Sequence, residues 1–212
     1  MRVIAMLIFC SLLAIFPCYG QSDRALLRRV IKTSIEARTF FQHLGEISSK
    51  NNVLVAVEAL ASNEPASCRT AFRLASNETL EISLDALMVQ CSVYQWREHD
   101  GIIVVAPIQR DSNSVMEVIV DGLAISNRTI DECVSELFDS VGVRTWQEKN
   151  NVQFDSTKAY PGPAKDPTTY SFLFDNQTLR QALHKLVKNT KSKFFVVYFL
   201  TEDRKHIAVN IF

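Results

Sequence analysis

The motif Asn-x-Thr followed by an apolar residue occurs three times in this sequence, every 49 or 50 residues, and it constrains the fold more than any other feature. The copies begin at Asn77, Asn127 and Asn176. From the apolar residue that ends each motif, further apolar residues recur at offsets of four, seven and eight, which lie on one face of an α-helix. These residues are Leu84, Leu87 and Met88, then Val134, Leu137 and Phe138, then Leu183, Leu186 and Val187. The recurrence predicts one folding unit that is present about three times.

The threonine of each motif lies where the predicted helix begins. A threonine hydroxyl there accepts a hydrogen bond from an unpaired backbone N–H of the first turn, so each threonine is expected to be a helix N-cap. The three threonines are Thr79, Thr129 and Thr178. Glu132 and Gln181 complete a capping box in the second and third copies, whereas Ile82 cannot do so in the first. The motifs also match the acceptor sequence for N-glycosylation, which is the alternative explanation for them.

Each predicted helix is preceded by one strand and followed by two. Alternating apolar residues predict the strands, and Asp100-Gly101 indicates a hairpin turn in the first copy. In the first unit we expect a strand around 70–74, a helix over 80–90 and strands over 93–96 and 102–105. In the second unit we expect a strand over 115–120, a helix over 130–140 and strands over 143–147 and 152–154. In the third unit we expect a strand around 170–174, a helix over 179–189 and strands over 194–200 and 206–212. The expected fold class is α+β, with repeated β-α-β-β units packed helix on sheet and preceded by an N-terminal helical segment.

The segments outside the units have other patterns. Apolar residues at near-helical spacing predict a long amphipathic helix over 23–45, and a shorter helix is expected over 53–61, where a strand is the alternative. Residues 155–168 hold three prolines and a glycine, which predicts a linker or surface loop. The expected organisation is N-terminal helices over 21–62, units over 63–110 and 111–154, the linker over 155–168, and a last unit over 169–212. We expect two domains separated by this linker, with one continuous sheet as the alternative.

The first 20 residues have the pattern of a cleaved secretory signal. Arg2 is followed by an apolar run over 3–16, and Cys18 and Gly20 place small residues before a cut at Gln21. A retained transmembrane helix is the alternative, but the run falls short of the ~20 residues that span a bilayer. A lipid anchor on Cys18 is a second alternative. The protein is therefore expected to be exported, either to a periplasm or to the extracellular space.

Three cysteines remain after the predicted cleavage, namely Cys68, Cys91 and Cys133. Their odd number leaves at least one thiol outside any intramolecular disulfide. A disulfide between Cys68 and Cys91 is a candidate, because a strand near Cys68 would lie beside the end of the first repeat helix. Cys91 still lies on the apolar face of the first repeat helix, and Cys133 occupies the position that Ser83 and Ala182 hold in the other copies, so both are also explained as small buried residues.

The composition and the motifs exclude several functions. The sequence has 23 basic and 23 acidic residues without a basic stripe, so a nucleic-acid partner is not expected. Its four histidines form no metal-binding spacing, and no C-x-x-C, G-x-S-x-G, P-loop or G-x-G-x-x-G is present. We therefore expect no catalytic residue, no cofactor and no metal ligand.

Residues 79–87 and 94–107 resemble the short N-terminal domain of secretins and TonB-dependent receptors. In that family a TLxxALxxLL helix is followed by a strand, a DG turn and an IVI strand, and residues 172–186 resemble the same unit. The resemblance implies protein-protein docking in a bacterial periplasm. The sequence shows no secretin ring segment and no outer-membrane barrel segment, so the resemblance implies neither secretion nor transport.

These observations favour an exported, non-catalytic protein-interaction module whose partner is another envelope protein. Strand addition to an exposed sheet edge is one way in which such a module binds. The alternatives are a hydrolase or redox protein that uses Cys133 or Cys91 in a cleft, and a purely structural envelope protein.

Overall fold

A computed structural model of the protein describes residues 24–31, 35–37, 39–59, 68, 72–109, 113–155, 168–199 and 204–211. The predicted signal peptide over 1–20 lies outside the described residues, as do residues 156–167 of the predicted linker. Helices and strands alternate along the described chain, which shows the α+β class predicted from the sequence.

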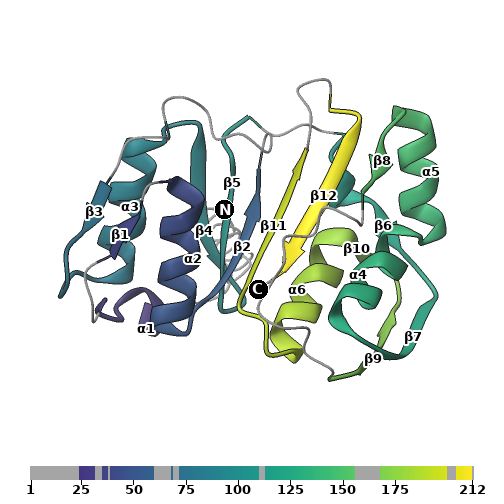
Figure 1. The fold of residues 1–212 in the computed structure, drawn as a ribbon, viewed down its shortest axis with the longest axis horizontal. Coiled ribbons are helices and arrows are strands. Elements are labelled where there is room, and N and C mark those ends of the chain that lie inside the picture. Colours follow the sequence, from purple (N-terminus) through teal and green to yellow (C-terminus); the bar gives the residue numbers. More distant parts are fainter. Residues whose placement is uncertain are drawn as a thin grey trace, which may run out of the picture.

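The largest sheet has six strands in the order β4-β5-β2-β11-β12-β8 (Figure 1). In that order, the strands are β4 (Tyr94–His99), β5 (Ile102–Pro107), β2 (Leu54–Glu58), β11 (Phe194–Phe199), β12 (His206–Ile211) and β8 (Gln153–Phe154). The three strands β5, β2 and β11 run parallel to one another. Strand β4 is antiparallel to β5, β12 is antiparallel to β11, and β8 is parallel to β12.

Hydrophobic clusters cover both faces of this sheet. Val55 and Val57 of β2 belong to a cluster with residues of α2 (Phe40–Asn51) and α3 (Leu80–Gln90). Ala56, which points the other way, belongs to a cluster with residues of α4 (Ile130–Phe138) and α6 (Leu179–Asn189). Figure 1 shows α2 and α3 on one side of the strands, and α4, α5 (Val141–Asn150) and α6 on the other. Strands buried on both faces read as nearly continuous apolar runs, which explains the composition of β5 and β11.

The chain is built from two similar halves. The first half runs β1-α2-β2-β3-α3-β4-β5, and the second runs β7-α4-β8-β9-α6-β11-β12, with α5 inserted after α4 and the two-residue strand β10 (Gln177–Thr178) before α6. Two short antiparallel sheets correspond as well, because β1 (Ile35–Ala37) pairs with β3 (Phe72–Leu74) and β7 (Leu123–Arg128) pairs with β9 (Tyr170–Phe174). In the large sheet, β4-β5-β2 and β11-β12-β8 follow one another in the same order. The repeat therefore has a fourth copy, β1-α2-β2, whose helix is capped by Thr39.

The prediction of one helix over 23–45 is wrong. Within this range, the described chain has a four-residue helix, α1 (Arg24–Leu27), then β1, and then the start of α2. The hydroxyl of Thr39 accepts a hydrogen bond from the backbone N–H of Gln42, and this cap sets the start of α2. The helix expected over 53–61 is also wrong, and the strand alternative is confirmed by β2. Its five residues are too few for a helix but suit a buried parallel strand.

Two predictions for the second unit are also wrong. Residues 143–147 lie in α5 and do not form a strand, because the chain turns into a helix after Ser140 and leaves it through Asn151 in the left-handed conformation. Residues 115–120 form a 3-10 turn, η2 (Val115–Glu117), and a two-residue strand, β6 (Ile119–Val120), which pairs with β10 (Gln177–Thr178).

The expected division into two domains is wrong for the described chain. Strand β11 of the last unit pairs with β2 of the first half, and this pairing makes one continuous sheet. The proline-rich segment lies between two strands that both pair with the second half of the chain, β8 with β12 and β9 with β7, so it does not separate two folded bodies.

Candidate functional site

A crevice lies beyond the carboxyl ends of the three parallel strands. Its volume is about 760 Å³, which is within the usual size range of ligand pockets. After β2 the chain leads through β3 to α3 on one face of the sheet, whereas after β5 it leads to η2 on the opposite face. In open α/β sheets, ligands bind where neighbouring connections diverge in this way. We name this site the strand-end crevice; it is lined by Glu58, Ala59, Ser92, Val93, Pro107, Ile108, Gln109, Asn113, Ser114, Val115, Met116, Glu117, Trp146, Arg180, Val197, Tyr198, Phe199, Arg204 and Ile207.

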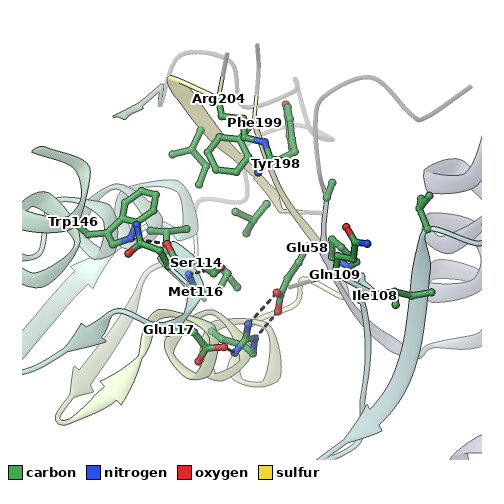
Figure 2. A pocket seen from close by; sticks show the side chains of 18 of the residues that line it. Glu58, Ile108, Gln109, Ser114, Met116, Glu117, Trp146, Tyr198, Phe199 and Arg204 are labelled. Carbon is green, nitrogen blue, oxygen red and sulfur yellow. Dashed lines mark hydrogen bonds and ion pairs between the residues drawn. The ribbon is translucent and has the colours of Figure 1, made fainter. Parts of the chain in front are cut away.

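A buried arginine joins two carboxylates at one wall of the crevice (Figure 2). Arg180, the second residue of α6, donates from Nε to Oε1 of Glu58 at 2.5 Å and from Nη2 to Oε2 of Glu58 at 3.0 Å. Its Nη1 donates to Oε1 of Glu117 at 2.6 Å. The side chains of Arg180 and Glu58 are only 10% and 12% exposed, whereas Glu117 is 48% exposed. We name this group the Arg180 cluster.

Burial and pairing act in opposite directions on Arg180. Loss of water around the guanidinium would lower its pKa, but the hydrogen bonds and charges of Glu58, and then those of Glu117, raise the pKa above its ordinary value. The guanidinium therefore stays charged at every relevant pH. A planar fork with two parallel hydrogen bonds to one carboxylate is the geometry that arginine favours for such pairs, and it fixes both side chains in place.

The other walls are mostly apolar or aromatic. Val115 and Met116 of η2 face the crevice and are buried in the cluster around α6. The indole N–H of Trp146 in α5 donates to the backbone oxygen of Asn113 at 2.9 Å. This hydrogen bond holds the indole ring against the loop before η2. At the far side, the guanidinium of Arg204 lies 5.7 Å from the ring centroid of Phe199, a cation-π contact.

The three motif threonines do not line this crevice. Each caps its helix: the hydroxyl of Thr79 accepts from the backbone N–H of Ile82, that of Thr129 from Glu132, and that of Thr178 from Gln181. The capping box is present at Thr129 and Thr178, because the side chains of Glu132 and Gln181 accept from the cap backbone N–H. Their role in the structure is to start helices.

None of the three cysteines lines the crevice either. Cys68 and Cys91 form a disulfide with Cα atoms 4.6 Å apart, and Cys91 ends α3. Cys133 of α4 is a buried free thiol. Burial, followed by the charges of Glu136 and Glu132, raises its pKa to about 11. A thiol that stays protonated at neutral pH is a poor nucleophile.

Sequence reasoning missed the residues of the Arg180 cluster. Glu58 ends the buried strand β2, so a charge at the end of an apolar run was the available signal for it, whereas Glu117 ends the 3-10 turn η2 and gave no such signal. The local pattern of α6 did not distinguish Arg180. The equivalent residue of α3 is the exposed Glu81, so the repeat predicts an ordinary surface position for Arg180 as well. The described residues contain no group of three or more His, Cys, Asp or Glu side chains placed to hold a metal ion.

No protein family model, no curated protein and no solved structure matches this chain. The resemblance to the secretin and TonB short N-terminal domain therefore stays a prediction. Within the described part of the chain, no helix combines the length and the apolar character needed to cross a bilayer.

Proposed function

We propose that the protein is an exported, non-catalytic binding module and that the strand-end crevice is its binding site. The observation that carries the proposal is the Arg180 cluster: three charged side chains, two of them almost buried, meet in a crevice at the carboxyl ends of parallel strands. A buried ion pair is weak evidence for stability, because desolvation offsets most of the attraction. Its position in a crevice whose other walls are mostly apolar or aromatic favours a role in recognition.

The geometry favours binding over chemistry. Both carboxylate oxygens of Glu58 already accept hydrogen bonds from Arg180, so this group is arranged for charge pairing and positioning. General acid and base work requires a group that is free to exchange a proton with the substrate. Export is proposed from the signal-like pattern at 1–20 alone.

The proposal is tested by blocking the crevice. Ile108 and Ile119 are both about half exposed, but only Ile108 lines the crevice. We expect Ile108→Trp to abolish binding of any small molecule that co-purifies with the secreted protein, as measured by native mass spectrometry, and Ile119→Trp to have no effect. Equal retention of such molecules by both variants, or no bound molecule in either variant or the wild type, would contradict the proposal.

The thiol-based alternative makes a separate prediction. Because Cys133 is buried and its pKa is raised, its thiol should react with a water-soluble disulfide reagent only after the protein unfolds. The measurement is the rate of reagent release with and without denaturant, with a Cys133→Ala variant as the control for other thiols. Rapid reaction of the folded protein at pH 7 would restore the hydrolase or redox hypothesis.

A second candidate function is docking of an envelope protein on α3, in line with the sequence prediction. Ile82 and Val89 on the outer face of α3 are 54% and 78% exposed. The equivalent positions of α6, 99 residues later, are the polar Gln181 and Lys188. One helix of the duplicated pair therefore exposes two apolar residues at positions where the other has polar ones, and exposed apolar residues of this kind are found at interaction surfaces.

This docking is tested by giving α3 the surface of α6. The double substitution Ile82→Gln and Val89→Lys should remove any specific partner recovered by crosslinking in envelope extracts. Val141→Lys is the control, since Val141 is a 75% exposed apolar residue on α5. Loss of the partner with the control, or its retention by the double variant, would argue against docking on α3.

A further inference from the structure

The Arg180 cluster carries one positive and two negative side chains, so the wall of the crevice that it forms has a net negative charge. Glu58 is engaged at both oxygens, whereas only one oxygen of Glu117 accepts from Arg180. Glu117 is also the exposed member, at 48%. A ligand group near Glu117 is therefore favoured if it is a cation or a hydrogen-bond donor, and an anion there is repelled.

The opposite side of the crevice has the opposite character. Arg204 is exposed and contacts the face of Phe199, and no carboxylate among the described residues forms an ion pair with it. Figure 2 shows Arg204 and Phe199 across the open space from Glu58 and Glu117. An arginine held in this way binds carboxylates well, because its fork matches their two oxygens.

The surface between the two charged ends suits a peptide with apolar side chains. Met116, Val197 and Ile207 also line the crevice and offer apolar contact. Arg180 has five N–H donors, of which the three described hydrogen bonds use three, so one donor remains on each terminal nitrogen. The carbonyl oxygen of a peptide bond is an acceptor of the right kind for these donors. The volume of about 760 Å³ suits a ligand of two to four residues in size.

From these contacts we infer that the strand-end crevice binds a short zwitterionic peptide with apolar side chains. The peptide's ammonium group lies at Glu117, its carboxylate at Arg204, and its backbone carbonyl at Arg180. This inference rests on the proposed function, and it adds the chemical class of the ligand.

The test uses trileucine and two blocked forms of it, with the full exported chain and titration calorimetry. N-acetylation removes the ammonium charge and C-amidation removes the carboxylate charge. We expect each modification to weaken binding by about tenfold or more, because each removes a charge-assisted hydrogen bond. In Glu117→Gln, which keeps an acceptor for Arg180, acetylation of the peptide should no longer weaken binding. In Arg204→Gln, amidation should no longer weaken binding. We call each such loss of affinity a penalty.

Two controls make the outcomes separable. Glu136→Gln and Arg128→Gln alter an ion pair that does not line the crevice, and both should keep the wild-type penalties. Melting temperatures show whether each variant folds. Penalties that persist in Glu117→Gln and Arg204→Gln would overturn the inference, as would the absence of trileucine binding. If trileucine does not bind but another molecule binds the wild type and Ile119→Trp and not Ile108→Trp, the proposed function stands and the peptide inference fails. If no molecule binds, both fail.

Discussion

The Asn-x-Thr motif is explained residue by residue through the backbone. Asn77, Asn127 and Asn176 all have positive φ angles, of 72°, 53° and 48°. The threonine two residues later is extended in every copy and caps the helix. Asparagine tolerates the left-handed conformation better than most residues, because its short polar side chain bonds locally. In these three copies the asparagine therefore supplies the left-handed backbone before the cap, and the threonine supplies the cap itself.

The caps predict a measurable order of stability. Thr129→Ala and Thr178→Ala should each lower the free energy of unfolding by about 1 kcal/mol, within roughly 0.5 to 2 kcal/mol. Thr79→Ala should cost less, because Ile82 returns no hydrogen bond to the cap backbone. Denaturant unfolding of the three variants measures the order. A cost at Thr79 larger than at the other two would contradict the role given to the capping box.

His184 predicts a pH dependence of stability. Burial, followed by the charges of Arg180, His99, Lys188 and Arg97, lowers the pKa of His184 to about 4 in the folded protein. Its ring also packs against Phe195, and its Nε2 is buried without a hydrogen-bond partner among the described residues. In the unfolded chain, the pKa of a histidine is about 6.5. The folded ring is therefore neutral at a pH where the unfolded ring is charged.

The sign follows from proton binding. Between about pH 6.5 and pH 4 the unfolded chain binds the extra proton, so this histidine lowers stability as the pH falls through that window and has no such effect above it. In the wild type, this effect lowers the free energy of unfolding by about 3 kcal/mol near pH 4, and we expect His184→Leu to remove that decrease. Unfolding free energies of both proteins at pH 7.5, 5.5 and 4.5 give the comparison. Identical pH profiles would show that His184 is not the responsible group.

At the scale of elements, the repeat helices are held by the leucines that their sequence pattern selects. Leu84 of α3, Leu137 of α4 and Leu186 of α6 are fully buried. They lie in the two clusters on opposite faces of the sheet. Leu84 is in the cluster with α2, and Leu137 and Leu186 are in the cluster with α4 and α6. The same motif therefore builds two separate layers.

These leucines should matter more than the caps. Leu84→Ala, Leu137→Ala and Leu186→Ala each remove buried methyl groups and leave a cavity, so each should cost roughly 2 to 5 kcal/mol. The measurement is the same denaturant unfolding that is used for the threonine variants. If the leucine variants lose no more stability than the threonine variants, these helices do not bury the assigned face.

At the scale of the whole molecule, the two halves share one sheet, and both contribute residues to each of the two hydrophobic clusters. Strand β2 pairs with β11 across the boundary, and Ile102 and Val104 of the first half lie in the cluster that contains α6 of the second half. The outer edges are less suited to further pairing. Strand β8 has only two residues, and β4 carries Arg97 and Glu98 near its end, charges that blunt an exposed edge.

One sheet and shared hydrophobic clusters predict one unfolding transition. The chain has two tryptophans, Trp96 in β4 of the first half and Trp146 in α5 of the second. Each single-tryptophan variant, Trp96→Phe or Trp146→Phe, therefore reports one half by fluorescence. Within each variant, we expect the fluorescence transition to coincide with the loss of circular dichroism, as two-state unfolding requires. A tryptophan transition separate from the backbone transition would support the division into two domains.

The sequence by itself determined the features that depend on neighbours along the chain. The ends of α3 and α6 were predicted to the residue, and the caps at Thr79, Thr129 and Thr178 were found, because a cap and a helical face involve residues within a few positions of each other. The Asp100-Gly101 turn between β4 and β5 was found for the same reason, since both residues have positive φ angles that few other residue types adopt.

The tertiary structure alone decided the strand order, the helical state of α5 and the candidate site. Residues 143–147 suit a strand or a helix locally, and only packing against the rest of the second half selects the helix. Arg180 and Glu58 are 122 residues apart in the chain, and their pairing exists because β2 and α6 are brought together by a sheet that joins both halves. Short-range patterns hold no information on such a contact, because the two residues meet only once the whole sheet has formed.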